Sequence, residues 1–443
     1  MLKKLVNICI LLLASAHEFK NCGTNDLNVQ SIQLYPDPPH IGEILDVSLT
    51  GKSHIDVEQP VIEVDLSILG IPLTTVHVDV CQNNKCPLPS GSVFSVDLNY
   101  TLPNKSPGSL PIDVTLKATD QGRSIGCYSL QTNVVDYTQD ITIEDDIYWL
   151  FHHWKRQYNV QYNNVVEEVY RYGIFWNNTK YVLLNNHPSV VLSHNKYSDL
   201  DRSEYRQKLG YKYSPDWRNV SHIVVYNSTL PPAVDWRTVG AVTPVKNQGQ
   251  CGSCWSFSVT GALEGAYFIK TGTLVSFSEQ ELVDCDHVDK GCNGGQMDDA
   301  FEWIHNNSGL CSEASYSYGG KVGTCVKCQP VKNSSVSGYV DVHPSEEALM
   351  AALTQPPVAI AIEADHMSFQ FYSSGVYSGN CGTNLDHGVL LVGYGSENGT
   401  DYWIVKNSWG NTWGDNGYIY IARGSGTEGG ECGIELSASY PVM

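Results

Sequence analysis

Two cysteines three residues apart stand at the start of an apolar, helix-compatible run. Cys251 and Cys254 lie in Gln248-Gly249-Gln250-Cys251-Gly252-Ser253-Cys254-Trp255, and the run continues to Lys270. A thiol at the start of a helix faces unpaired backbone N–H groups and the positive end of the helix dipole, which both favour the thiolate. This stretch predicts either a reactive thiol or a structural cysteine beside a disulfide, and the rest of the chain has to decide between them.

A nucleophilic thiol needs a base and a group that orients the base. His387 lies in Leu385-Asp386-His387-Gly388-Val389 and precedes an apolar, strand-like run, and Asn407 lies in Asn407-Ser408-Trp409-Gly410. These two residues follow Cys254 by 133 and 153 positions. In papain-like proteases the catalytic histidine and asparagine follow the catalytic cysteine by roughly 130–150 positions.

Residues 230–443 resemble papain and cathepsin L almost from end to end. The resemblance implies an α+β peptidase domain with two lobes, which begins near Leu230. In that family Cys254 and His387 would form a thiolate–imidazolium pair with a lowered thiol pKa, and Asn407 would orient the imidazole. The expected reaction is acyl transfer: the thiolate attacks a peptide carbonyl, the amine leaves, and the thioester is hydrolysed.

The same resemblance assigns the groups around the reacting bond. Gln248 and the Cys254 backbone N–H would form the oxyanion hole. The expected substrate-binding residues are Gly294, Gly295, Met297, Ala361, Leu385, Trp409 and Ser437. Of these, Met297, Ala361, Leu385 and Ser437 would line the S2 pocket, which predicts a hydrophobic or aromatic P2 residue. No histidine-rich insertion separates Cys285 from Cys292, which favours an endopeptidase.

The number of cysteines fits an oxidising compartment. The chain has 14 cysteines, of which Cys9 lies in a predicted signal peptide; if Cys254 is a free thiol, the remaining twelve can pair completely. By resemblance, the pairs in the peptidase domain are Cys251–Cys292, Cys381–Cys432, and Cys285 with either Cys325 or Cys328. We expect Cys285–Cys325 and Cys311–Cys328. A zinc or redox role for Cys325-x-x-Cys328 is disfavoured because no second close Cys/His pair accompanies it.

The first segment, residues 17–139, predicts an all-β sandwich of the immunoglobulin-like class. Short alternating runs such as Val76-His77-Val78-Asp79-Val80 are separated by clusters of Pro, Gly and Asn. Cys81–Cys86 and Cys22–Cys127 bridges would close the segment, although its four cysteines allow other pairings. Tyr35 to Gly42, Asp79 to Leu88 and Gly126-Cys127-Tyr128 resemble the MD-2-related lipid-recognition (ML) family. That resemblance implies a lipid ligand between the sheets; the alternative is a closed core that serves targeting or folding.

The second segment, residues 140–229, predicts a mainly helical propeptide. Ile147, Leu150, Phe151, Trp154 and Tyr158 recur at helical spacing. A second face contains Glu167, Arg171, Phe175, Asn178, Val182 and Asn186. This helical face and the stretch Ser193-x-Asn195-x-Tyr197-x-Asp199 together resemble the inhibitory propeptide of cathepsin L-like enzymes. The resemblance implies a chain that crosses the active-site cleft in the non-productive direction, and we expect acid to loosen it by protonating Glu167 and its neighbours.

The composition argues against some classes of binding partner, and the N-terminal residues indicate the cellular compartment. The net charge is −20 with 17% charged residues, which argues against nucleic acid and anionic membranes as partners. Residues 1–16 predict a signal peptide, because Lys3 and Lys4 precede a short apolar run and Ala14-Ser15-Ala16. Asn-x-Ser/Thr sequons suggest glycosylation. We predict a secreted or lysosomal protease zymogen that acts on proteins or peptides, without a transmembrane segment, metal or other cofactor. The alternative is a lipid-binding or signalling protein whose protease domain is secondary.

Overall fold

The structure is a computed structural model that describes residues 19–24, 26–35, 44–82, 84–101, 111–133, 143–187, 189–212, 230–379, 381–397 and 399–443. The predicted signal peptide and the sequons at Asn104, Asn219, Asn227 and Asn398 lie outside these residues. The chain divides into two compact units, Met1–Tyr172 and Gly173–Met443, and the boundary falls within helix α2 (Val165–Asn185).

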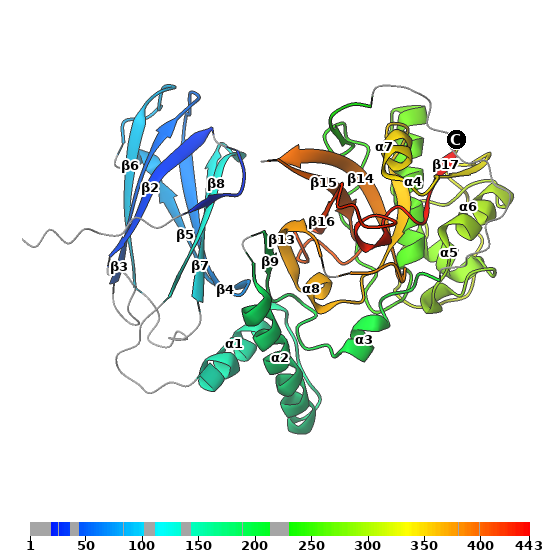
Figure 1. Cartoon of the computed structure of the whole chain (residues 1–443), viewed down its shortest axis with the longest axis horizontal. Coiled ribbons are helices and arrows are strands. Elements are labelled where there is room, and N and C mark those ends of the chain that lie inside the picture. Colours follow the sequence, from blue (N-terminus) through cyan, green and yellow to red (C-terminus); the bar gives the residue numbers. More distant parts are fainter. Residues whose placement is uncertain are drawn as a thin grey trace, which may run out of the picture. The chain divides into compact units, whose positions relative to one another are not determined.

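The first unit contains the predicted β-sandwich, drawn in blue and cyan in Figure 1. Its strands are β1 (Lys20–Asn21), β2 (Leu27–Tyr35), β3 (Ile44–Ser53), β4 (Pro60–Ile68), β5 (Ile71–Asp79), β6 (Val93–Thr101), β7 (Pro111–Asp120) and β8 (Arg123–Asn133), with a short 3₁₀ turn at Val80–Gln82. One sheet has the order β1-β8-β7-β4-β5 and the other β2-β3-β6, with all pairs antiparallel. Every second residue of β4 is buried, as the alternating sequence requires.

Two predicted helices follow the sandwich. Helix α1 (Ile143–Gln157) buries Ile147, Leu150, Phe151 and Trp154, so the expected apolar face is confirmed. In α2 the residues Phe175, Asn178 and Val182 are buried. Asn186 lies one residue beyond α2, where its side chain accepts from the Leu192 N–H (2.6 Å) and donates to the Leu192 carbonyl (3.0 Å).

The second unit is built on a nine-stranded mixed sheet with the order β11-β17-β12-β14-β15-β16-β13-β9, in which β10 also pairs with β14. The strands are β9 (Val190–Leu192), β10 (Val234–Asp235), β11 (Gly338–Asp341), β12 (Val358–Ile362), β13 (Tyr372–Tyr377), β14 (His387–Glu397), β15 (Thr400–Lys406), β16 (Tyr418–Ala422) and β17 (Ala438–Val442). Strand β9 comes from the propeptide and extends the edge of the sheet antiparallel to β13.

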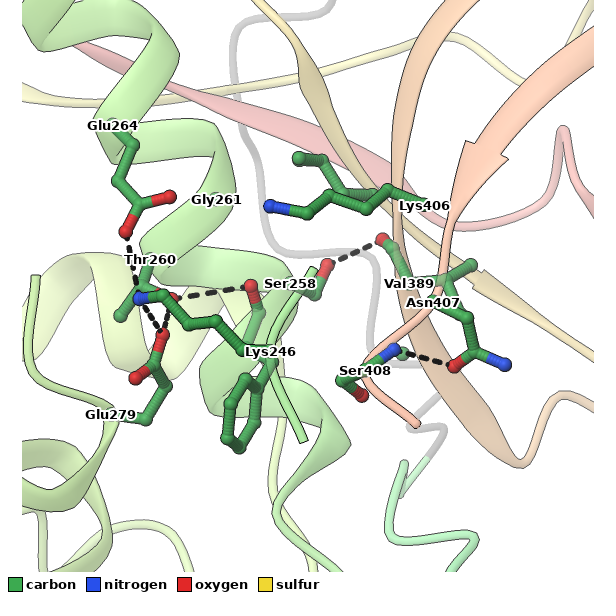
Figure 2. A pocket seen from close by; sticks show the side chains of 13 residues that line it. Lys246, Ser258, Thr260, Gly261, Glu264, Glu279, Val389, Lys406, Asn407 and Ser408 are labelled. Atoms are coloured by element: carbon green, nitrogen blue, oxygen red, sulfur yellow. Dashed lines mark hydrogen bonds and ion pairs between the residues drawn. The ribbon is translucent and has the colours of Figure 1, made fainter. Parts of the chain in front are cut away.

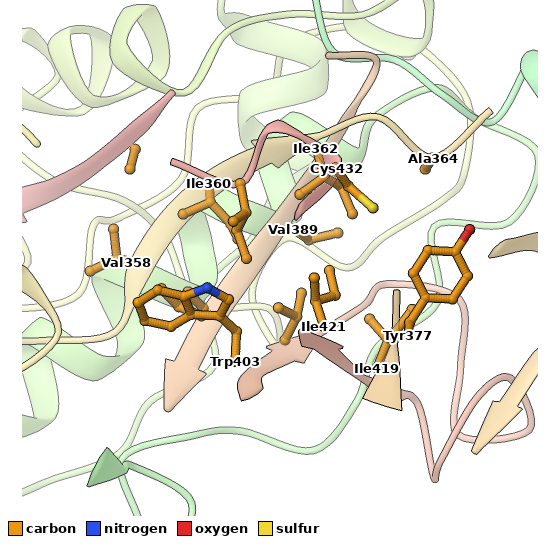
Figure 3. Packing of buried hydrophobic residues seen from close by; sticks show 14 of the residues in the cluster. Val358, Ile360, Ile362, Ala364, Tyr377, Val389, Trp403, Ile419, Ile421 and Cys432 are labelled. Carbon is orange, nitrogen blue, oxygen red and sulfur yellow. The ribbon is translucent and has the colours of Figure 1, made fainter. Parts of the chain in front are cut away.

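Two apolar cores support the two lobes. One lies in the β-rich lobe and joins side chains of β12, β14, β15 and β16, including Val358, Val389, Trp403 and Ile421 (Figure 3). The other lies around the helices α4 (Cys254–Thr271), α5 (Glu279–Cys285) and α6 (Met297–Asn306). The shorter helices are α3 (Arg202–Arg206), α7 (Glu346–Ala352) and α8 (Met367–Gln370), with 3₁₀ turns at Gly291–Asn293 and Glu431–Gly433.

Helix α4 runs between the two lobes and carries the candidate nucleophile at its first position. Its first fourteen residues are all buried, and Glu264 is the one charged residue among them. The helix ends at Gly272, whose left-handed backbone (φ 72°) lets its N–H reach the Phe268 carbonyl. Close packing positions the helix, because a Cβ on Gly261 would lie 2.7 Å from the Leu390 side chain of β14.

Six disulfides are present in the described residues: Cys22–Cys127, Cys81–Cys86, Cys251–Cys292, Cys285–Cys325, Cys311–Cys328 and Cys381–Cys432. Cys254 is the one cysteine of the described residues without a disulfide partner. The bridge at Cys251 therefore lies three residues before a free, buried thiol.

Candidate active site

The candidate nucleophile and base begin two neighbouring elements. Cys254 is the first residue of α4 and His387 is the first residue of β14, and both are fully buried. The backbone N–H of Gly388 lies 3.4 Å from the Cys254 sulfur, so the start of the strand is in direct contact with the thiol. A Cβ on Gly388 would lie within 3.2 Å of the Trp255 backbone, which explains why glycine follows the histidine.

The imidazole of His387 has one defined partner. Its Nε2 lies 2.9 Å from Oδ1 of Asn407, an oxygen that also accepts the Ser408 N–H at 2.7 Å. Because an amide oxygen only accepts, Nε2 carries the proton and Nδ1 presents a lone pair. Nδ1 has no hydrogen-bond partner among the described residues, which leaves it available to exchange a proton. The Trp409 ring lies 4.8 Å from the imidazole and is fully buried, so it covers this pair.

Gln248 is fixed by bonds at both ends of its side-chain amide. Oε1 accepts from the Ser408 hydroxyl (2.7 Å) and the Trp409 indole (3.1 Å). Nε2 donates to the carbonyl of Cys251 (2.9 Å) and to the carbonyl of Lys208 (2.8 Å). The donor expected to bind an oxyanion is therefore occupied by a propeptide carbonyl in this form.

The propeptide residues 208–212, here called the cleft segment, cover the thiol. The Gly210 N–H donates to the Cys254 sulfur at 3.2 Å. The Gly295 N–H donates to the Gly210 carbonyl (2.9 Å) and the Lys212 N–H donates to the Gly295 carbonyl (3.1 Å). These bonds form a parallel bridge between Tyr211 and Gly295. Gly294 lies beside it, because a Cβ there would be 2.4 Å from the Gly210 carbonyl oxygen.

The predicted S2 residues share a buried cluster or a hydroxyl contact with one propeptide side chain, Tyr211. Tyr211 is 6% exposed and belongs to the same buried cluster as Met297, Ala361 and Leu385. Its hydroxyl lies 2.8 Å from the Ser437 hydroxyl. Three of the four predicted S2 residues thus belong to the same apolar cluster as this aromatic side chain, and the fourth contacts its hydroxyl. Sequence reasoning missed Tyr211, Gly210 and Lys208, because none of them belongs to a motif and only the folded contact reveals them.

Burial opposes charge on the nucleophile and the base. It raises the pKa of the Cys254 thiol to about 11, although N–H groups of Gly388 and Gly210 act in the other direction. Burial also lowers the pKa of His387 to about 4, and nearby Lys208 adds to this while the bond to Asn407 opposes it. With the cleft segment in place, burial therefore favours the neutral thiol and the neutral imidazole, and the lowered thiol pKa expected for the thiolate–imidazolium pair stays a prediction for the open cleft.

A second propeptide stretch, residues 193–199 and here called the anchor segment, binds away from the thiol. The Ser193 N–H donates to the Phe371 carbonyl (2.9 Å), and Asn195 Nδ2 donates to the Gln370 carbonyl (2.7 Å). Gln370 Nε2 in turn donates to the Tyr197 carbonyl (3.0 Å). The Tyr197 ring meets Trp409 edge to face at 5.7 Å, which links the anchor to the residue that covers His387.

A buried ionic network lies behind the first turns of α4 (Figure 2). Lys246 pairs with Glu264 (2.8 Å) and Glu279 (2.6 Å), and the Thr260 hydroxyl donates to Glu279 (2.5 Å). These side chains line a small cavity, which Asn407 and Ser408 also border. One helical turn after Cys254, the Ser258 hydroxyl donates to the Val389 carbonyl at 2.7 Å, which joins the nucleophile helix to the histidine strand. Sequence reasoning did not find this network, because its members are far apart in the chain.

Neither candidate metal-binding cluster of the described residues contains a free cysteine thiolate. Two clusters bring possible ligand atoms together: Glu281 with Cys311 and Cys328, and Glu431 with Cys381 and Cys432. In both clusters the two cysteines are joined in a disulfide, so neither sulfur is a thiolate ligand. Within the described residues, no helix is both long and apolar enough to cross a membrane.

Three family models match this chain. Papain family cysteine protease matches residues 230–442, the cathepsin propeptide inhibitor domain (I29) matches 151–205, and the ML domain matches 16–134. Cysteine proteinase EP-B 1 of Hordeum vulgare is 44% identical over 322 residues, which cover 69% of this chain and 86% of that protein. Cysteine endopeptidase Rep1 of Oryza sativa subsp. japonica is 43% identical over 320 residues, with 69% and 86% covered.

Solved structures of proforms agree with these matches. The proform of the ragweed pollen allergen Amb a 11, a cysteine protease, has a TM-score of 0.62 and 38% identity, over 68% of this chain and 94% of that chain. Digestive procathepsin L 3 of Tenebrio molitor larval midgut has a TM-score of 0.61 and 38% identity, over 67% and 99%. The chain belongs to the papain family of cysteine proteases and carries a propeptide and an ML domain ahead of its protease domain.

Proposed function

We propose that the chain is the zymogen of a cysteine endopeptidase in which Cys254 is the nucleophile, His387 the base and Asn407 the orienting residue. The observation that supports these roles best is the arrangement of a free thiol on the helix start beside a histidine whose Nε2 is committed to Asn407. Nδ1 then remains as the atom that takes the thiol proton. Gln248 Nε2 and the Cys254 N–H would stabilise the oxyanion.

Catalysis begins when the cleft segment leaves. The Cys254 proton passes to His387 Nδ1, and the sulfur attacks the substrate carbonyl carbon. The tetrahedral oxyanion collapses, the C–N bond breaks, and Nδ1 returns the proton to the leaving amine. Water, deprotonated by His387, then attacks the thioester and releases the acid and the thiol. Removing the cleft segment admits water and frees the Gln248 donor, which reverses the burial that keeps both groups neutral.

The contacts of the cleft segment explain why the propeptide is an inhibitor and not a substrate. The Cys254 sulfur receives an N–H from Gly210, not a carbonyl carbon. The carbonyl that reaches Gln248 belongs to Lys208, two residues earlier. A nucleophile and an oxyanion donor that engage different peptide units cannot act on one bond.

Tyr211 supports a preference for aromatic or large apolar P2 residues. Its ring is buried in the apolar cluster that contains Met297, Ala361 and Leu385, and its hydroxyl lies 2.8 Å from the Ser437 hydroxyl. No acidic side chain takes the place of Ser437, so an arginine at P2 would find no countercharge at that position. We propose the secretory pathway as the compartment, with secretion or a lysosome-like lumen as the destination, because six disulfides need an oxidising environment.

The test uses matured enzyme and fluorogenic peptides. Peptides with Phe or Leu at P2 should be cleaved far faster than peptides with Arg at P2. A thiol-directed epoxide should abolish the cleavage, and Cys254→Ala should lower kcat by at least about 10⁴-fold, as expected for loss of a nucleophile. If matured wild-type enzyme shows no thiol-dependent cleavage, the proposal is wrong.

Lipid binding by the N-terminal sandwich is a second candidate function. Its two sheets turn alternating buried aliphatic residues inward, such as Leu49 and Val96 from one sheet and Val64 and Leu116 from the other. An apolar interior of this kind suits an acyl chain if the sheets separate. Mass spectrometry of the purified full chain after solvent extraction tests this candidate: a stoichiometric co-purified lipid supports it, and none after incubation with mixed phospholipid vesicles contradicts it.

A further inference from the structure

His194 of the anchor segment is enclosed between the propeptide helix α2 and the protease. It is 3% exposed. Phe175 of α2 stacks on its imidazole, with ring centroids 4.3 Å apart and an angle of 8° between the planes. Phe371, which follows α8 in the protease domain, meets it edge to face at 6.3 Å. The imidazole therefore forms part of an apolar contact between the propeptide and the protease domain.

The hydrogen bonds of His194 define which nitrogen carries the proton. The Thr179 hydroxyl donates its hydrogen to the Phe175 carbonyl at 2.7 Å. That hydroxyl oxygen also lies 3.0 Å from His194 Nε2, so it must accept there and Nε2 must donate. Nδ1 is therefore unprotonated, and it is buried without a hydrogen-bond partner in the described structure. A proton added in acid must go to this nitrogen.

No countercharge is built around this imidazole in the described residues. The elements around His194 are α2, the anchor segment and the end of α8 with the two residues after it, and their charged and titratable residues other than His194 are Glu167, Glu168, Tyr170, Arg171, Tyr172, Lys180, Tyr181, Lys196, Tyr197, Asp199 and Tyr372. The Lys180 ammonium lies over the Trp176 ring (4.2 Å) and the Lys196 ammonium lies over the Tyr197 ring (4.9 Å). Burial is the cause of a fall in the His194 pKa to about 3. An added proton would thus create an uncompensated charge in an apolar contact.

The position of His194 connects its charge to propeptide binding. Its two neighbours, Ser193 and Asn195, make the hydrogen bonds to the carbonyls of Phe371 and Gln370. Glu167 instead accepts from the backbone and side chain of Asn163, two residues before the start of its own helix. The described bonds of Glu167 are therefore local, whereas His194 lies at the contact with the protease itself.

We propose that protonation of His194 Nδ1 in acid releases the anchor segment from the protease domain and thereby starts activation of the zymogen. This inference rests on the proposed function of the chain as a protease zymogen. A histidine whose pKa is depressed in the bound state favours binding fully above its free pKa of about 6.5 and loses that contribution as the pH falls toward 3. The opening equilibrium should rise about tenfold per pH unit in this window, or about a hundredfold at pH 4.5.

The direct test measures opening without catalysis. Full-length Cys254→Ala precursor, which cannot process itself, is followed by hydrogen–deuterium exchange of residues 193–212 between pH 7 and pH 4, corrected for the intrinsic pH dependence of exchange. His194→Phe and His194→Met keep an apolar, uncharged side chain, and His187→Gln is the matched control because His187 is exposed. We expect both His194 variants to shift the opening midpoint down by at least one pH unit and the control to leave it unchanged.

A second readout uses the Cys254-containing precursors. Self-processing at pH 4.5 should slow at least tenfold in His194→Phe, while enzyme matured at neutral pH by an added protease should have unchanged peptide cleavage. If both His194 variants open at the same pH as wild type, the inference is wrong. If opening shifts but no precursor ever becomes active, the switch stands and the proposed protease function fails.

Discussion

The propeptide contacts the protease in two places that depend on different parts of the chain. The cleft segment is held mainly by backbone groups: the Gly210 N–H on the thiol, the Lys212 N–H on Gly295, and the Lys208 carbonyl on Gln248. The anchor segment depends on buried side chains, above all Asn195 and His194. The cleft contact therefore requires a particular backbone path, and the anchor contact requires particular side chains.

This difference separates inhibition from its control. Most bonds of the cleft segment join backbone groups, which do not titrate. Burial lowers the pKa of its Lys208 ammonium to about 7, so this side chain is already charged below about pH 6 and acid adds no further charge to the cleft segment. The anchor segment carries a titratable imidazole and a buried amide, so a fall in pH can weaken its contact with the protease domain. Three substitutions, in decreasing order of expected effect, test whether the two contacts are separate.

Gly210→Ala should damage the cleft contact most. A Cβ at this position would lie 1.8 Å from the Gly252 carbonyl oxygen, and backbone cannot yield as a side chain does. We expect a loss of about 3 kcal/mol in binding of the cleft segment, which raises cleavage of a fluorogenic peptide by intact precursor at pH 7 about a hundredfold. Gly173→Ala on α2 is the control, because a Cβ there meets nothing within 4 Å. Equal activity of the two variants would contradict the cleft geometry.

Asn195→Ala should weaken the anchor contact. The amide donates to the Gln370 carbonyl, and its oxygen accepts the Tyr197 N–H at 2.9 Å, so truncation leaves buried groups unpaired. The expected cost is about 2 kcal/mol, or about a thirtyfold faster self-processing at pH 5.5. Asn185→Ala, which loses only a local bond to the Tyr181 carbonyl, should process like wild type. Unchanged processing in Asn195→Ala would show that the anchor is dispensable.

Tyr211→Phe should have the smallest effect. The ring stays in its buried cluster at the predicted S2 pocket, and only the bond to the Ser437 hydroxyl is lost. We expect about 1 kcal/mol, or about a fivefold rise in activity of intact precursor at pH 7. The same variant combined with Ser437→Ala should show less than additive effects, whereas full additivity would place the two hydroxyls out of contact.

The sequence was most informative where chemistry restricts residue type. The helix beginning at Cys254 and the apolar face of α1 followed from spacing, and the resemblance located His387 and Asn407. The contacts of Gly210, Tyr211 and His194 could not be predicted, because each depends on a partner that is distant in the chain, such as Cys254 for Gly210 (44 residues away) and Ser437 for Tyr211 (226 residues away), or on a tautomer set by Thr179. The lowered thiol pKa expected from the helix start and the histidine stays a prediction for the open cleft, because that reasoning did not include the segment that buries the thiol here.

The pH dependence of Cys254 alkylation tests the central claim that the cleft segment keeps a catalytic thiol neutral. Iodoacetamide labelling of Cys254 is followed by mass spectrometry from pH 7 to pH 10 in intact precursor and in matured enzyme. Because burial raises the thiol pKa to about 11, precursor labelling should be negligible at pH 7 and still be rising at pH 10. Matured enzyme should label rapidly at pH 7 and change little above it. Identical profiles, with rapid labelling of the precursor at pH 7, would contradict the account.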